Sequence, residues 1–110
     1  MNNNKLTKIQ AENGNDMFSF PLLNEWDNFD FILYILLNNL GYKVVKMEDE
    51  AWYKNYKLKN KKHKISLAHD EMFGNIIYSS AKKQKKVYED KLETVANEIL
   101  AIVDQKTNIS

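Results

Sequence analysis

Two stretches of the chain repeat apolar residues at the spacing of one helix face. In the first stretch, Asn24 is a candidate N-cap, and Gly41 is placed to end the helix in a left-handed conformation. This pattern predicts a helix over about residues 25–40, and a second run predicts an amphipathic helix over about residues 83–105. The apolar positions are Trp26, Phe29, Leu33, Leu36, Leu37 and Leu40 in the first, and Tyr88, Leu92, Val95, Ile99 and Ile102 in the second.

Between these helices the period changes from 3.6 to 2, which is typical of strands. Four strands are expected, over about residues 42–47, 52–59, 64–68 and 72–80. The segments 48–50, 59–62 and 69–71 are expected to be turns, and they are too short for crossover helices. The predicted fold is therefore α+β: a helix, a four-stranded antiparallel meander and a helix. In this two-layer sandwich both helices cover one face of the sheet.

The first 15 residues are mostly polar and are expected to form a loosely ordered tail. Alternation at Met17–Phe20 marks a short candidate strand, so residues 16–110 are expected to form a single domain. No apolar stretch near the start suggests a secretory signal, and the longest apolar run covers only residues 31–37. We expect the protein to be cytoplasmic.

The composition narrows the chemistry. The chain has 110 residues and no cysteine, which excludes disulfides and a thiol nucleophile. Its formal net charge is +1, and every basic residue is a lysine. The absence of arginine argues against base-specific recognition of nucleic acid. No phosphate-binding glycine motif is present, and we expect no cofactor and no metal.

The candidates for catalysis are few. His63 and His69 have the same parity along one predicted strand, so they are placed to emerge on one face, as in ribonucleases that use paired histidines as acid and base. Lys64 and Glu71 are available to complete such a set. The competing interpretation is that His63 is an exposed turn residue and that His69 ends a strand. We expect no enzymatic activity, and a small ribonuclease or toxin remains an alternative.

Charges are unevenly distributed along the chain. Residues 51–64 carry six lysines and no acid, interleaved with Trp52, Tyr53 and Tyr56. This pattern leaves open a module that binds single-stranded nucleic acid, although its exposed lysines also protect a sheet edge from aggregation. The residues that would contact nucleic acid are Lys54, Lys57, Lys59, Lys61 and Lys62.

Acidic residues are concentrated in two of the predicted turns. Alternate turns of a meander lie at one edge of the sheet, so these residues are expected to form one patch suited to a basic protein partner. The candidate partner-binding residues are Glu48, Asp49, Glu50, Asp70 and Glu71. An ordinary solvated set of turns is the competing interpretation.

In size and style the whole chain resembles the small immunity proteins of bacterial toxin systems, including contact-dependent growth inhibition. The segments Trp52–Lys54, Ile65–Leu67 and Gly74–Tyr78 resemble the meander of such proteins. The resemblance implies a cytoplasmic, cofactor-free protein that binds a cognate toxin, frequently a nuclease, and blocks it. It is a resemblance to a class without a shared motif, and it assigns no role to any residue.

Overall fold

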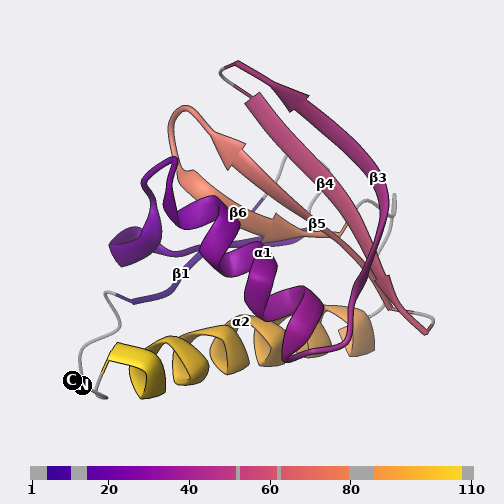
Figure 1. Cartoon of the computed structure of the whole chain (residues 1–110). Helices are drawn as coiled ribbons and strands as arrows, with labels where there is room; N and C mark the ends of the chain where they lie inside the picture. Colours follow the sequence, from indigo (N-terminus) through magenta and orange to yellow (C-terminus); the bar gives the residue numbers. More distant parts are fainter. Residues whose placement is uncertain (1–4, 11–14, 52, 62, 80–85, 108–110) are drawn as a thin grey trace.

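A computed structural model describes residues 5–10, 15–51, 53–61, 63–79 and 86–107. These residues form a six-stranded antiparallel sheet with the strand order β1-β2-β6-β5-β4-β3 (Figure 1). The strands are β1 (Thr7–Gln10), β2 (Asp16–Ser19), β3 (Lys43–Glu50), β4 (Tyr53–Asn60), β5 (His63–Asp70) and β6 (Gly74–Tyr78). The helices are η1 (Pro21–Leu23), α1 (Asn28–Asn38) and α2 (Lys86–Thr107).

The predicted four-stranded meander is wrong. Strands β3 to β6 pair in succession, but β2 pairs antiparallel with the free edge of β6, and β1 pairs with β2. Strand β1 lies within the segment expected to be a tail. It has a weak apolar pattern, with Ile9 as its only apolar residue, and its backbone pairing with β2 holds it in the sheet. Pairing of this kind leaves little trace in the hydrophobic pattern.

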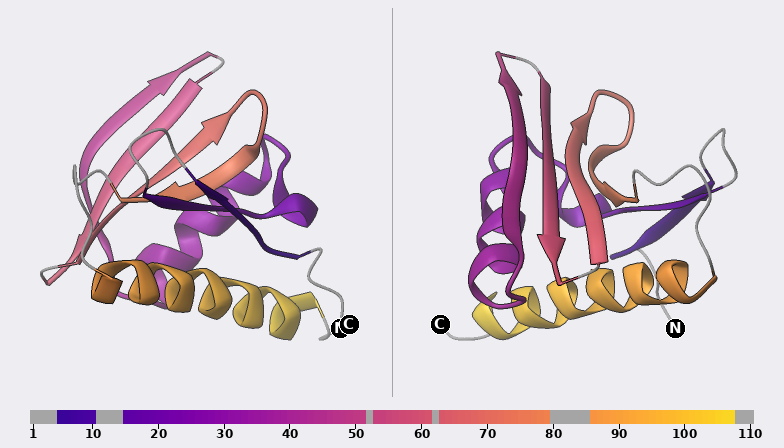
Figure 2. Two further views of the ribbon diagram at one scale, coloured as in Figure 1. Left: turned by 180° about the vertical axis from the view of Figure 1, so that it is seen from behind. Right: turned by 90° about the vertical axis from the view of Figure 1, so that its right-hand side faces the viewer.

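Both helices share one core with a single face of the sheet, which we call the helix-side face. Helix α1 contacts β5, α2 contacts β2 and β6, and the two helices contact each other. Figure 2 (right) shows β3, β4 and β5 side by side, with α1 behind the strands and α2 across their lower ends. The buried side chains of this core include Phe29, Ile32, Ile35 and Leu36 from α1, Leu92, Val95 and Ile99 from α2, and Phe18, Leu58, Ile65, Leu67 and Ile77 from the sheet.

The N-terminus of α1 differs from the prediction, and its C-terminus is followed by Gly41 as predicted. The helix begins at Asn28 instead of near residue 25. Asp27 is its N-cap residue, but the side chain of Asp27 makes no hydrogen bond to the N–H groups of the first turn. Asn24 lies against Gly74 instead of capping a helix. At the other end Gly41 has a φ of +76°, and the N–H of Tyr42 donates to the carbonyl oxygen of Leu36 at 2.9 Å. This is the left-handed termination that Gly41 predicts.

Several residues expected in turns belong to strands. Glu48, Asp49 and Glu50 form the last part of β3, and His69 and Asp70 end β5. In the β4–β5 turn, Lys61 takes the positive φ of 54°, although Asn60 is the residue type that favours this conformation. Because antiparallel pairing extends β3 and β5 beyond their apolar positions, strand ends are where the pattern is least informative.

Candidate functional site at the acidic end of the sheet

Two neighbouring hairpins bring the predicted acidic residues to the same end of the sheet. Lys54 pairs with His69, so the first residues of β4 lie beside the last residues of β5. The β3–β4 and β5–β6 hairpins therefore point the same way, toward the top of Figure 1. We call the group formed by Glu48, Asp49, Glu50, Asp70 and Glu71 the acidic end.

The five acidic side chains are not equivalent. Glu48 and Glu50 lie opposite Asn55 and Tyr53, on the outer face of the sheet away from the helices. Asp49 lies on the helix-side face, where its Oδ2 accepts a hydrogen bond of 2.8 Å from the hydroxyl of Tyr56. All three side chains are exposed, and among them Asp49 has a role in the fold through this hydrogen bond.

Asp70 and Glu71 divide in the same way. The Oδ1 atom of Asp70 accepts the backbone N–H groups of Met72 at 2.7 Å and Phe73 at 3.0 Å, and so stabilises the β5–β6 turn. Glu71 is exposed, and none of the ion pairs between described residues includes it. The same holds for Glu48 and Glu50. Glu48, Glu50 and Glu71, together with Asp49, thus present four negative charges to solvent at this end.

An open hollow of about 800 Å³ lies between the two hairpins. At its base, Nδ2 of Asn55 donates to the hydroxyl oxygens of Tyr78 at 2.7 Å and Tyr53 at 3.0 Å. The Oδ1 atom of Asn55 is buried and has no hydrogen-bond partner among the described residues. The hollow is lined by Met17, Trp26, Ala51, Tyr53, Asn55, Ala68, His69, Asp70, Glu71, Ile76 and Tyr78.

Exposed apolar side chains stand next to the acidic residues. Met72 is 81% exposed, and Phe73 and Tyr53 are 38% and 37% exposed. Methionine and aromatic residues are enriched at protein–protein interfaces, where they supply most of the buried contact. The sequence pattern missed this feature because it assigned Met72 and Phe73 to a strand. The signal for a turn was the aspartate two residues before them with Gly74 after them.

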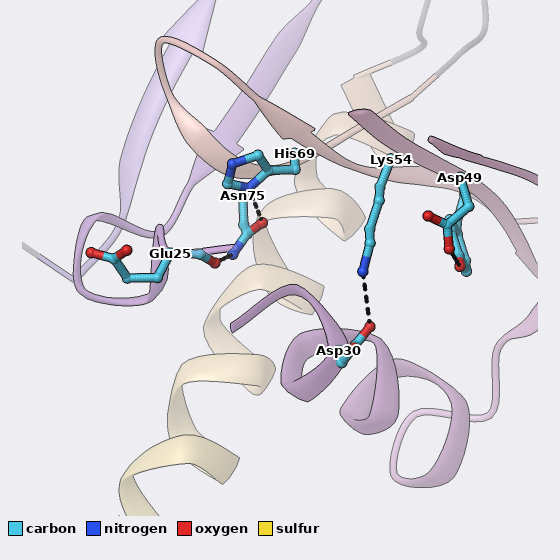
Figure 3. Close-up of polar contacts among 7 residues, drawn as sticks. Glu25, Asp30, Asp49, Lys54, His69 and Asn75 are labelled. Carbon is cyan, nitrogen blue, oxygen red and sulfur yellow. Dashed lines mark hydrogen bonds and ion pairs between the residues drawn. The ribbon is translucent and has the colours of Figure 1, made fainter. Parts of the chain in front are cut away.

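Lys54 lies inside the protein, so its predicted contact with nucleic acid is wrong. Its side chain faces the helices, where Nζ is 3.4 Å from Oδ1 of Asp30 (Figure 3). The ammonium also lies 4.8 Å from the ring centroid of Trp26 and 5.0 Å from that of Phe29. Two aromatic faces and one carboxylate stabilise this buried cation. It joins α1 to the first part of β4, behind the acidic end.

The side chain of Asn75 holds the segment before α1 against the sheet through hydrogen bonds. It is fully buried, and its Nδ2 donates to the carbonyl oxygens of Leu23 at 2.6 Å and Glu25 at 2.9 Å. Since carbonyl oxygens only accept, the amide orientation is determined, and Oδ1 of Asn75 must face His69 Nδ1, 2.9 Å away. The Nδ1 atom of His69 therefore carries a proton. The His69 ring also packs edge-on against Trp26.

The two histidines do not form a catalytic pair. His63 begins β5 and His69 lies six residues further along the strand, which separates them by about 20 Å. His63 is buried, contrary to the interpretation as an exposed turn residue, and its Nδ1 is 2.6 Å from the hydroxyl of Tyr42. A shared substrate atom is out of reach of both rings, so the arrangement that a paired-histidine ribonuclease requires is not present.

The remaining candidate lysines lie away from the acidic end. Lys57 and Lys59 are exposed on the outer face of β4, and Lys61 lies in the β4–β5 turn. Lys62 and Trp52 lie outside the described residues. Tyr56 is buried in the core, so it is not available for stacking on a base beside the lysines.

Comparison of the chain with known protein families, with characterised proteins and with solved structures finds no match. Within the described ranges, no helix has the length and apolar character needed to cross a bilayer. Across the same ranges, no three histidine, aspartate or glutamate side chains come together in a metal-binding arrangement.

Two buried phenols of the core predict a loss of stability at high pH. Burial, with the charge of Glu98, raises the pKa of Tyr42 to about 12. Burial, with the hydrogen bond to Asp49, raises the pKa of Tyr56 to about 12. The unfolded chain ionises its tyrosines first, near pH 10, so the free energy of unfolding should fall between about pH 10 and 12, by up to about 2 kcal/mol for each phenol.

Urea unfolding at pH 9 and pH 11.5 measures this loss. Tyr42→Phe and Tyr56→Phe should each lose less stability than the wild type between these two pH values. Tyr34, which is 54% exposed, supplies the control Tyr34→Phe. If all three variants lose as much stability as the wild type, ionisation of these phenols does not limit stability at high pH.

Proposed function

We propose that this chain is a non-catalytic protein-binding inhibitor, an immunity protein that neutralises a cognate bacterial toxin in the cytoplasm. The observation that supports the proposal most is the composition of the acidic end. Exposed Glu71 lines a hollow, exposed Glu48 and Glu50 lie in the neighbouring hairpin, and the apolar side chain of Met72 is exposed directly after Glu71. A protein interface needs apolar contact for affinity and complementary charge for orientation and rapid encounter.

The charge of this surface favours a basic partner. A nuclease binds phosphate groups with lysine and arginine, so its substrate-binding surface is positively charged. The acidic end is complementary to such a surface, and an inhibitor bound there would exclude the nucleic acid. We therefore favour a toxin of the nuclease type.

Affinity capture from the native host tests the proposal. The tagged wild type should retain a basic protein in stoichiometric amount, and Glu50→Lys/Glu71→Lys should not. Glu93→Lys/Glu98→Lys changes the net charge equally on exposed positions of α2 and should retain the protein like the wild type. Retention by all three chains, or by none, would contradict binding at the acidic end.

Removing the apolar contact should weaken binding without affecting the fold. Met72→Ala truncates a side chain that is 81% exposed, so the free energy of unfolding should change by less than about 0.5 kcal/mol. If Met72 is buried in the interface, the Kd for the captured partner should rise about tenfold or more, mainly through faster dissociation. Surface plasmon resonance measures both rates. Val45→Ala, at a 65% exposed position, is the control and should bind like the wild type.

A further inference from the structure

A second charged surface covers the opposite end of the outer face. Its members come from three neighbouring strands, and the register places them opposite one another. Lys43 pairs with Lys59, Lys59 also pairs with Lys64, and Lys46 pairs with Lys57. All five side chains are exposed. We call this group, formed by Lys43, Lys46, Lys57, Lys59 and Lys64, the lysine face.

The arrangement is unfavourable for the isolated chain. Like charges directly opposite one another destabilise a sheet, and the lysine face contains three such pairs. None of the five lysines takes part in the ion pairs found between described residues, which use Lys5, Lys8 and Lys54. A single ligand with several negative charges would neutralise all of these groups together.

The lysine face differs from a protein-binding surface. Lysine is depleted at protein interfaces, where arginine and aromatic residues are enriched. The chain has no arginine, and the aromatic residue of β4 nearest this end, Tyr56, is buried on the other side of the sheet. A depression of about 320 Å³ is lined by three of the lysines, Lys57, Lys59 and Lys64, and by Val45, Leu58 and Ile65. Arginine binds a carboxylate through a planar group with two parallel hydrogen bonds. The ammonium group of lysine has no such geometry and binds phosphate as a point charge.

The size of the lysine face indicates how many backbones it accommodates. The row of Lys43, Lys59 and Lys64 crosses two strand spacings, about 10 Å in all. One strand of nucleic acid carries a negative charge about every 3.4 Å, so a single backbone laid along this row presents about three phosphates to its three lysines. We propose that the lysine face binds the phosphate backbone of one strand of nucleic acid without reading its sequence. This inference does not rest on the proposed function, because it concerns different residues and needs no protein partner.

Fluorescence anisotropy with a labelled deoxythymidine 20-mer tests the proposal on the purified full chain. Binding should weaken as salt increases, with a log–log slope of up to about −3.5 if five lysines each contact a phosphate. Lys57→Gln/Lys59→Gln should bind at least tenfold more weakly and reduce the slope by about 1.4. Lys5→Gln/Lys91→Gln removes the same charge elsewhere and should bind like the wild type.

The fold of the variant is monitored by its melting temperature. Since Lys59 lies opposite two lysines and Lys57 lies opposite another, Lys57→Gln/Lys59→Gln should melt at the wild-type temperature or about 2 °C above it. Weaker binding by a variant that melts no lower supports the proposal. Absence of binding at 25 mM salt, or an equal loss in the Lys5→Gln/Lys91→Gln control, overturns it. Equal competition by polyglutamate of matched charge would identify an acidic protein as the ligand class instead.

Discussion

An alanine at position 74 should destabilise the protein by about 3–5 kcal/mol, which is a large part of the stability of a small domain. Gly74 has a φ of +71°, which strains any residue with a Cβ atom. An added Cβ would also lie 2.4 Å from Cβ, 2.8 Å from the carbonyl oxygen and 2.9 Å from Cα of Asn24. Two of these atoms are backbone atoms, so the loop before α1 would have to leave the sheet.

Gly41 offers a matched control for this substitution. Its φ of +76° produces the same conformational strain, but the nearest atom to an added Cβ is Nδ2 of Asn60, at 3.4 Å. Gly41→Ala should therefore lose only about 1–2 kcal/mol. Urea unfolding of both variants separates strain from collision. Equal losses would show that the contact between Gly74 and Asn24 does not hold the loop.

Charge reversal at the acidic end is expected to have the largest effect on function. Glu50→Lys/Glu71→Lys should slow association with the captured partner by about 10- to 100-fold at low salt, because long-range attraction becomes repulsion. Both residues are exposed and make no ion pair with another described residue, so the fold should remain intact. Asp49 is left unchanged because it accepts the hydrogen bond of Tyr56, and reversing it would disturb the core.

Stopped-flow association at several ionic strengths measures this effect. The wild-type rate should fall as salt increases, and the rate of Glu50→Lys/Glu71→Lys should depend on salt much less or with the opposite sign. Glu93→Lys/Glu98→Lys serves again as the control of equal charge and should associate at close to the wild-type rate. A rate set only by net charge would slow both variants equally, and the acidic end would then have no special role.

Much of the fold follows from patterns that the chain states clearly. Apolar residues at helical spacing predicted the buried positions Phe29, Leu36, Leu92 and Ile99, and Gly41 predicted the end of α1. Strand β1 was not predicted because an edge strand held by backbone pairing needs no hydrophobic pattern. The start of α1 was predicted too early because Asn24 does not cap the helix. Asn24 instead contacts Gly74, which lies 50 residues further along the sequence.

In the candidate site, the position of the acidic residues could be predicted from the sequence, whereas the burial of Lys54 could not. Alternate turns of a meander do lie at one end of a sheet, which is why the acidic residues of two hairpins come together. Parity alone showed that Lys54 lies on the same side as the core residues Tyr56 and Leu58, but its charge suggested exposure. The rings of Trp26 and Phe29, supplied by a distant segment, make its burial favourable. Such compensation is not visible in the local sequence.

Titration of the captured partner's nuclease activity with the purified wild-type chain tests the central claim most directly. The account predicts that cleavage of nucleic acid falls linearly and stops at one chain per partner molecule. Glu50→Lys/Glu71→Lys should require a large excess for the same inhibition. Full nuclease activity in the presence of excess bound wild-type chain would contradict the claim that this protein is an inhibitor.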